Sequence, residues 1–453
     1  MEDMAHWIDT QHLLAKARQS LISGGIQGRA KNGRQLWDRE SGRHPGRLSW
    51  TRWHALMKTS LGKILSMISC CALLQPPPVW ADEGDVINLS AGVSVLSDDN
   101  LFRLPSSADP QSDTITTTTV GLNLNKAIGL QRVIANVKLI DYRYQRNDYL
   151  DFLALNYDAK WLWAAGTRWT GELAFQRSQL PNNYANDRTL GRRNVQIYLL
   201  NRFETNYWFH SSWAAVAGVL RTSLENQVTT SVDGDYEADG YNLGLRYLGA
   251  SGNSLTARAI HLEGTYSKRP FNSFFQFDNG FTQDNYQLDF SWRLSGISQL
   301  RGRIEYLDRE YQHFSQRDYS GLAANLQYVY AISGKSTLTL AYIRALEAYQ
   351  QLTTSYYVLD DVAVSAQWLA TGKVTVNGLL GYGRQDYRGA IIPLPAGVAQ
   401  RQDNTARLGF DLAYQAAPWL QFKAGLTLQK RNSNYDIYEY KDRTAFVSAT
   451  LQY

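Results

Sequence analysis

The charged residues best placed for chemistry in this chain stand at alternate positions on either side of one short turn. Arg293 precedes the turn, and Arg301 and Arg303 follow it. Two neighbouring strands would bring these arginines together, and a cluster of this kind attracts an anionic solute in a pore. The alternative is a structural ladder in which Asp289 and Glu305 neutralise the arginines. The residues alone favour both interpretations equally.

Other polar side chains recur in the same way, on one face of many segments whose other face is apolar. Successive side chains of a strand point to opposite sides, so the pattern assigns the polar set to one common surface. We predict that this surface is the polar interior of a barrel. The residues assigned to the interior are Lys138, Glu172, Gln196, Arg202, Asp289, Arg293, Arg301, Arg303, Glu305, Arg407, Asp411 and Lys423.

The alternation is clearest in residues 284–294, 405–414, 420–428 and 444–453. Their apolar faces carry no charged residue, and only Phe446 breaks the pattern in the last segment. A Lys or Arg on a lipid-facing surface would cost roughly 2–4 kcal/mol at the bilayer midplane. The pattern therefore predicts strands with one face toward lipid and one toward water.

Eighteen such segments can be counted, which predicts an all-β, antiparallel, up-and-down transmembrane β-barrel of about eighteen strands over residues 82–453. The predicted strands are residues 86–96, 114–125, 132–145, 151–164, 168–179, 190–203, 208–221, 236–248, 254–267, 283–294, 299–310, 319–332, 336–348, 356–368, 373–387, 404–415, 419–430 and 442–453.

The connections alternate in length. Residues 249–253, 295–298, 333–335, 370–373 and 416–419 are short, whereas 97–113, 222–235, 268–282, 311–318, 388–403 and 431–441 are long and polar. Short periplasmic turns and long extracellular loops are typical of outer-membrane barrels. With an even strand number and a long first connection, we expect both termini on the periplasmic side.

Composition agrees with a barrel. The 28 Tyr and 13 Trp include many at apolar strand ends, as expected of aromatic girdles at the two membrane interfaces. They include Trp161, Trp163, Trp169, Trp208, Tyr247, Trp292, Tyr328, Tyr330, Trp368 and Trp419. No apolar run reaches 18 residues, so a helical membrane protein is not expected. A secreted β-sandwich or propeller is the alternative, but its strands would be shorter and their outer faces polar.

A secretion signal is predicted at residues 57–81. Met57 and Lys58 precede an apolar run of 11 residues, 64–74, and we place cleavage after Ala81. Residues 1–56 look like an over-extended, disordered leader, with a long basic n-region as the alternative. Residues 67–70 loosely resemble a lipidation box, which leaves a lipoprotein open.

Removing this leader changes the chemistry that the composition allows. Of the 46 basic and 41 acidic residues, 11 and 5 lie in residues 1–81, so the remainder carries a net charge of −1. Nucleic acid is therefore not an expected partner. Both cysteines, Cys70 and Cys71, also lie in the leader, so the exported chain has neither disulfides nor thiolate metal sites.

Catalytic motifs are missing from the sequence. His210, His261 and His313 show no metal-binding spacing, and no nucleophile elbow or phosphate loop occurs. We therefore predict no enzyme, no cofactor and no metal site. An outer-membrane lipid hydrolase with a Ser–His pair is the enzymatic alternative.

The most distinctive local stretch is Asp98-Asp99-Asn100-Leu101-Phe102-Arg103-Leu104-Pro105, which opens the first long loop. Its two adjacent carboxylates, Asp98 and Asp99, are candidates for a divalent ion. Turn chemistry is favoured instead, because Asp and Asn form local backbone hydrogen bonds and Pro ends the segment.

This stretch, following a first strand and a secretion signal, resembles EpsL-type proteins, which are encoded in exopolysaccharide biosynthesis operons. The resemblance extends over residues 82–453, where the remainder is shared barrel character, and residues 1–56 depart from it. It implies a β-barrel porin that takes part in exopolysaccharide export and implies no catalytic residues. Tyr453 resembles the C-terminal signature that the barrel assembly machinery reads in outer-membrane proteins.

We therefore expect a bacterial outer-membrane barrel that lets an exopolysaccharide pass through its polar lumen without an energy source of its own. Its expected partners are outer-membrane lipid, the assembly machinery, the polysaccharide, and periplasmic or inner-membrane export proteins. A general diffusion porin and a plugged barrel that docks a secretion complex are the alternatives.

Overall fold

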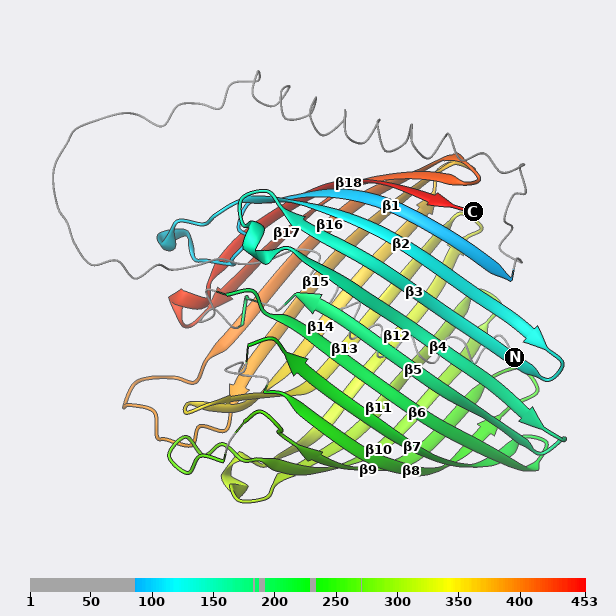
Figure 1. Ribbon diagram of the computed structural model, residues 1–453, viewed down its shortest axis with the longest axis horizontal. Coiled ribbons are helices and arrows are strands. Elements are labelled where there is room, and N and C mark those ends of the chain that lie inside the picture. The colour runs from blue at the N-terminus through cyan, green and yellow to red at the C-terminus, as the bar shows by residue number, and fades with distance from the viewer. Residues whose placement is uncertain (1–85, 182–183, 187–191, 229–233, 270) are drawn as a thin grey trace. The chain divides into compact units, whose positions relative to one another are not determined.

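The computed structural model describes residues 86–181, 184–186, 192–228, 234–269 and 271–453. Within them, eighteen antiparallel strands form one sheet, in which each strand pairs with its neighbours in sequence (Figure 1). The sheet closes because β1 pairs with β18. Closure removes the free edges whose unpaired backbone groups hydrocarbon would not tolerate. The predicted all-β barrel is confirmed.

The strands are β1 (Ile87–Asp98), β2 (Asp113–Ile128), β3 (Gln131–Tyr144), β4 (Phe152–Ala165), β5 (Trp169–Pro181), β6 (Val195–His210), β7 (Trp213–Asn226), β8 (Tyr236–Leu248), β9 (Ser254–Thr265), β10 (Gly280–Ser295), β11 (Ser298–Tyr311), β12 (Tyr319–Ser333), β13 (Ser336–Gln351), β14 (Thr354–Leu369), β15 (Val374–Arg388), β16 (Gln402–Ala417), β17 (Leu420–Ser433) and β18 (Tyr440–Gln452). In the loops lie the single 3₁₀ turns η2 (Ser106–Ala108), η3 (Asp148–Leu150), η4 (Ser315–Arg317) and η5 (Asp436–Tyr438).

The outer face of the barrel is apolar. In β8, Tyr241 and Leu243 are 56% and 62% exposed, whereas Asn242 between them is 3% exposed. A continuous apolar band of this kind would associate in water, and in a barrel it matches the surface that lipid covers. The fold and this band place the protein in the bacterial outer membrane.

The two ends of the barrel differ in their connections. At one end, the short-turn end, the turns have two to five residues, as at 129–130 and 296–297. At the other, the long-loop end, 99–112, 266–279 and 389–401 are much longer, although β13 and β14 are joined by only two residues. β1 begins and β18 finishes at the short-turn end. That this end faces the periplasm stays a prediction.

Two predicted strands were misplaced. The segments 190–203 and 208–221 were expected, but β6 continues to His210 and β7 to Asn226. The predicted bounds left Glu204 and Asn206 between the two strands. Both are buried inward-facing residues of β6, and the turn lies at 211–212.

Aromatic side chains gather at the short-turn end. Trp169 packs against Tyr207 at 4.9 Å between ring centroids, and Trp213 packs against Tyr247 at 5.0 Å. Trp208 is an exception to the predicted girdle, because it shares the inward face with Glu204 and donates its Nε1–H to Thr170 Oγ1 at 2.9 Å.

The predicted signal peptide at 57–81, with Cys70 and Cys71, and the leader at 1–56 lie outside the described residues, so they stay predictions. Within the residues that the structure describes, no helix has the length and apolar character to cross a bilayer.

Candidate functional site in the barrel lumen

The twelve residues assigned to the interior share the inward face of their strands. The register aligns them across neighbouring strands, as in Gln287↔Glu305 and Asp289↔Arg303. They are Lys138, Glu172, Gln196, Arg202, Asp289, Arg293, Arg301, Arg303, Glu305, Arg407, Asp411 and Lys423. Which of them line a conducting path remains a prediction.

A buried ion network joins the inward faces of β6 to β11. Arg258 Nη2 on β9 lies 3.1 Å from Glu204 Oε2 on β6, three strands away, and Arg246 Nη2 on β8 lies 2.9 Å from Glu204 Oε1. Arg258 also pairs with Asp289, which accepts from Arg303 Nε at 2.9 Å. Contacts between non-adjacent strands form only on the concave side of a curved sheet. The network therefore lies inside the barrel.

The predicted arginine cluster does not present three unpaired charges. Arg303 pairs with Asp289, and Arg301 donates Nε–H to Gln327 Oε1 at 2.6 Å. Arg293 is exposed near the short-turn end, away from the buried network. Glu172 likewise pairs with Arg202. Among the described residues, Arg303 thus has the carboxylate partner that a structural ladder requires, whereas Arg301 bonds a neutral amide. The ladder and the anion-attracting ring therefore both stay predictions.

Charged side chains on the inward faces of β14, β16 and β17 are also paired. Arg407 donates to Asp361 Oδ1 at 2.6 Å, and Lys423 Nζ lies 3.1 Å from Asp411 Oδ1. Phe446, which broke the sequence pattern, points inward on β18. It lies opposite Gly425, where an added Cβ would come within 2.7 Å of the ring. Glycine at 425 therefore makes room for the inward aromatic ring.

A third stretch of the interior is almost free of charge. Inward positions of β18, β1 and β2 carry hydroxyl groups separated by small residues, and we call this surface the hydroxyl wall. Its members are Ser90, Ser94, Thr117, Thr119, Ser448 and Thr450. Gly92 lies opposite both Thr119 and Thr450, which leaves space beside these hydroxyl groups. Lys138 lies beyond the wall on β3 and is exposed.

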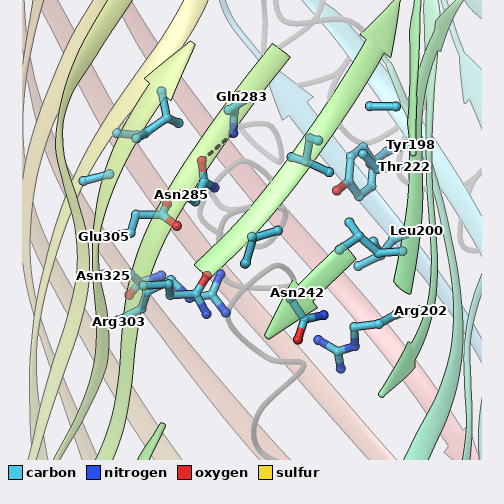
Figure 2. A pocket seen from close by; sticks show the side chains of 18 of the residues that line it. Tyr198, Leu200, Arg202, Thr222, Asn242, Gln283, Asn285, Arg303, Glu305 and Asn325 are labelled. Atoms are coloured by element: carbon cyan, nitrogen blue, oxygen red, sulfur yellow. Dashed lines mark hydrogen bonds between the residues drawn. The ribbon is translucent and has the colours of Figure 1, made fainter. Parts of the chain in front are cut away.

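A cavity of about 370 Å³ opens within the lumen beside the ion network. Figure 2 shows Arg202, Asn242 and Tyr198 on one side of it and Arg303, Glu305 and Asn325 on the other. Its lining mixes amides, paired charges and apolar side chains, so it is suited to an uncharged polar solute.

The Asp98–Pro105 stretch folds into the barrel mouth. Asp98, Asn100 and Arg103 are at most 3% exposed, and so are the apolar Leu101 and Phe102. Asn100 anchors the turn by donating Nδ2–H to the carbonyls of Leu104 and Lys441, at 2.8 and 2.9 Å. The first loop is therefore an inward packing element, for which its apolar residues were the only sequence signal.

Arg103 is the centre of this turn. Its guanidinium lies 3.0 Å from Asp98 Oδ1 and 2.6 Å from Asp442 Oδ1 on β18. Burial acts to lower the pKa of Arg103, but the carboxylates of Asp98 and Asp442 outweigh it and raise that pKa above its ordinary value. Arg103 also has a left-handed backbone, with φ of 53°. These contacts hold a conformation that non-glycine residues rarely adopt.

The carboxylates of Asp98, Asp99 and Asp442 approach one another closely enough to share a cation. The guanidinium of Arg103 already lies between Asp98 and Asp442 and supplies the positive charge. This arrangement agrees with the turn interpretation rather than with a divalent-ion site.

Residues 184–186, between β5 and β6, cross the mouth to the far wall, and we call them the strap. Arg431 on β17 donates to Ala185 O and Asn186 Oδ1, both at 2.9 Å, and Tyr349 on β13 donates its hydroxyl to Asn186 O at 2.8 Å. Tyr184 packs with Leu101 and Phe102 of the first loop. The long-loop end is therefore narrowed by loops that bind one another.

The tip of the β13–β14 hairpin adds to this closure. Tyr349, Gln350 and Val358 are each at most 3% exposed, and they stand on both faces of the hairpin. Arg317, fully buried in η4, donates Nε–H to Gln276 O at 2.7 Å and Nη1–H to the Gln351 carbonyl at 3.3 Å. Burial lowers the pKa of Arg317 to about 10. We call the first-loop turn, the strap and this hairpin tip together the cap.

The histidines are separated. His210 accepts from Ser212 N near the short-turn end, His261 meets Asp284 at 2.7 Å on the outer face, and His313 meets Asp278 at 2.9 Å in a long loop. Within the described residues, no histidine ring hydrogen-bonds a serine hydroxyl. Tyr453 exchanges backbone hydrogen bonds with Leu89 at the start of β1.

Sequence reasoning missed several inward charges. Arg246 and Arg258 alternate with apolar residues and were recognisable in the same way as the predicted set. Glu204 was missed because its strand was predicted to end at residue 203, whereas β6 continues to His210. The strap attachments of Arg431 and Tyr349 have no local sequence signal.

The chain is similar to one protein family over part of its length and to several solved structures. A family model described as "Putative beta-barrel porin 2" matches residues 256–453. No curated protein matches the chain. A solved structure of OpdK from Pseudomonas aeruginosa with vanillate is similar at 11% identity and a TM-score of 0.48, covering 81% of this chain and 99% of that chain.

A BenF-like porin from Pseudomonas fluorescens Pf-5 is similar at 10% identity and a TM-score of 0.48, covering 82% of this chain and 99% of that chain. OccK2 (OpdF) of Pseudomonas aeruginosa in complex with glucuronate is similar at 13% identity and a TM-score of 0.46, covering 81% and 97%. With the closed barrel and its apolar band, the family match identifies a porin-like outer-membrane β-barrel.

Proposed function

We propose that the barrel is a passive channel through which an exopolysaccharide chain crosses the outer membrane. The observation that carries this proposal is the hydroxyl wall of β18, β1 and β2. Hydroxyl groups both donate and accept, so they replace the water that a sugar loses on entering the lumen. Gly92 beside them has no side chain that could cover these hydroxyl groups. The resemblance of the Asp98–Pro105 stretch to EpsL-type proteins adds support.

Three arginines inside the barrel are neutralised by carboxylates, and this favours a neutral chain as the solute. Arg303 is paired with Asp289, Arg407 with Asp361 and Arg202 with Glu172. A paired arginine has little attraction left for a passing anion, because its field is cancelled nearby. An acidic polysaccharide would gain little from these arginines. Direction would have to come from polymerisation or from periplasmic partners.

Planar-bilayer conductance tests the channel. The cap narrows the mouth, so we expect the wild-type barrel to conduct weakly, in small steps. Replacing Arg431 by Gln together with Tyr349 by Phe removes both strap attachments to the far wall, and conductance is expected to rise severalfold. If neither the wild-type barrel nor the double variant conducts ions, the barrel is not a channel.

Polysaccharide release tests the solute. We expect deletion of the gene to hold polysaccharide in the periplasm. In the double variant Ser94→Val/Ser448→Val, which changes two hydroxyls that face each other, release should fall severalfold. Ser97→Val is the matched control, because Ser97 lies on the outer face of β1. Normal release from the deletion strain would contradict the proposal even if the barrel conducts ions.

The cap favours a second candidate, a closed barrel that docks a secretion complex. That function predicts silence in the bilayer for the wild-type and the strap-released barrel alike, together with lost release in the deletion strain. A general diffusion porin instead predicts rapid flux of small sugars into proteoliposomes and no effect on polysaccharide.

A further inference from the structure

Three cations gather on the outer face of the β17–β18 hairpin near the long-loop end. Lys430 lies directly opposite Lys441, and Arg443 lies opposite Leu428, so the three side chains form one patch, which we call the cationic rung. Below it on the same face, Leu426, Leu428 and Val447 are 43%, 40% and 58% exposed. The rung therefore begins where the apolar band ends.

The two lysines of the rung face each other without an ion pair of their own among the described residues. Like charges directly opposite each other on neighbouring strands destabilise a sheet. Among the residues that the structure describes, no carboxylate lies within 4 Å of either lysine amine, in contrast to the paired cations of the lumen. Arg443 has one distant partner, Asp99 at 3.9 Å, and its side chain is 77% exposed. An anion bound outside the protein would relieve this repulsion.

The surroundings of the lysines suit a phosphorylated sugar better than a bare anion. Both lysines line a recess of about 250 Å³ between the hairpin and the first loop. The hydroxyls of Ser106 and Ser107 line it too, as do the carboxylates of Asp436 and Glu439. Amines bind phosphate oxygens, whereas carboxylates and hydroxyls accept hydrogen bonds from sugar hydroxyls.

The opposite sector of the barrel has the reverse charge. The outer faces of β8 to β11 carry Glu237, Asp239, Glu263, Asp284 and Asp308 near the long-loop end. Arg221 pairs with Glu237 and His261 contacts Asp284, but the carboxylates outnumber these cations. A negatively charged headgroup would therefore be held less well there than at the rung. The outer surface near the long-loop end is therefore asymmetric in charge. An anionic lipid would be held on one side of the barrel.

We propose that the cationic rung binds the phosphorylated sugar headgroup of an outer-leaflet glycolipid, whose acyl chains lie on the apolar band below it. This orientation rests on the predicted extracellular position of the long loops. Two parts of the ligand are recognised. Lys430 and Lys441 bind its phosphate, and its acyl chains contact Leu426, Leu428 and Val447. The inference is independent of what passes through the lumen.

Binding of bisphosphorylated lipid A to the purified barrel in a neutral detergent tests this proposal. The double variant Lys430→Gln/Lys441→Gln should lower the affinity by about tenfold or more, because two charged donors are lost. The conservative variant Lys430→Arg/Lys441→Arg should retain binding. Lys126→Gln/Lys335→Gln is the matched control, because it removes the same charge at the short-turn end.

Two further measurements separate a binding role from a structural one. The Lys430→Gln/Lys441→Gln barrel should unfold at the same temperature as wild type or higher when no lipid A is present, since a like-charge pair is gone. Lipid A stripped of its phosphates should bind wild type about as weakly as the variant. Equal binding of lipid A to wild type and the variant would overturn the proposal. So would equal affinity for a water-soluble sugar phosphate, since that would exclude the lipid.

Discussion

The two ends of the barrel are held by different forces. At the short-turn end, consecutive strands are joined by turns of two to five residues, and ladder hydrogen bonds and aromatic pairs between neighbouring strands fix the geometry. At the long-loop end, segments far apart in sequence contact one another through buried side chains. Arg103 reaches Asp442, and Arg431 reaches the strap.

This difference has an energetic meaning. A short turn contributes local backbone energy, so a change there affects one hairpin. A buried charge in the cap is shared by several loops, and removing one partner leaves the others desolvated and unpaired. We therefore expect substitutions of similar size to destabilise the barrel much more at the cap than at the turns.

The largest effect is expected for Arg103→Ala. It leaves Asp98 and Asp442 buried without a cation, which typically costs about 3–5 kcal/mol. Urea unfolding of the barrel in detergent measures the loss. Arg143→Ala is the matched control, because Arg143 also pairs with two carboxylates but is 62% exposed, so solvent screens these pairs and the loss should be far smaller than for Arg103→Ala. Equal losses in the two variants would show that burial does not set the value of these pairs.

An intermediate, pH-dependent effect is expected for Asp278→Asn in the loop between β9 and β10. Burial acts to raise the pKa of Asp278, but hydrogen bonds from the His313 side chain and backbone outweigh it and lower that pKa below its usual value. A lowered carboxyl pKa gives stability that is present above the unfolded value of about 4 and is lost as pH falls through the folded value.

The measurement is hydrogen exchange of this loop at pH 6 and again as the pH falls below about 4. We expect wild type to lose protection on acidification, whereas Asp278→Asn is less protected at pH 6 by about 1–3 kcal/mol and changes little with pH. Parallel behaviour of the two proteins across this range would refute the role of the Asp278 carboxylate.

A smaller effect is expected at the short turns. Gly129 has a φ of 62° with open space around its missing Cβ, so Gly129→Ala strains only the backbone and should cost about 1 kcal/mol. Gly296→Ala is the control, because Gly296 also faces open space but has no positive φ. Comparable unfolding midpoints for the two variants would mean that turn conformation does not limit stability at this end.

The smallest effect is expected for Arg293→Gln. Arg293 is exposed on the inward face near the short-turn end, away from the buried network. Substitutions at such sites usually change the free energy of unfolding by less than about 0.5 kcal/mol. A loss approaching that of Arg103→Ala would contradict the contrast between the two ends.

Sequence predicted the part of the structure that local rules control. Tyr241 and Leu243 face lipid while Asn242 faces the lumen, and this two-residue period can be read from the sequence itself. Prediction failed at Glu204 and Asn206, since inward polar residues of a strand resemble a loop when a turn is expected nearby. The predicted number of strands was nevertheless correct, because the misplaced turn still separated the same two strands.

The cap could not be predicted from local sequence patterns. Nothing near Arg431 in the sequence indicates that it binds Ala185 and Asn186, because that contact spans about half the chain. The Asp98–Pro105 stretch was recognised as distinctive, yet its inward packing depends on Asp442 and Lys441, which come from the last strand. The lumen charges could be assigned to a face, but their partners could not.

The pairing of the first and last strands gives the Arg103–Asp442 contact a role in assembly. Sliding β18 along β1 by two residues would keep every side chain on its correct face and would preserve most of the ladder. It would, however, leave the guanidinium of Arg103 facing Thr444 or Tyr440 instead of a carboxylate. The contact therefore favours the native register of the seam, because a barrel closed two residues out of register would bury an unmatched charge.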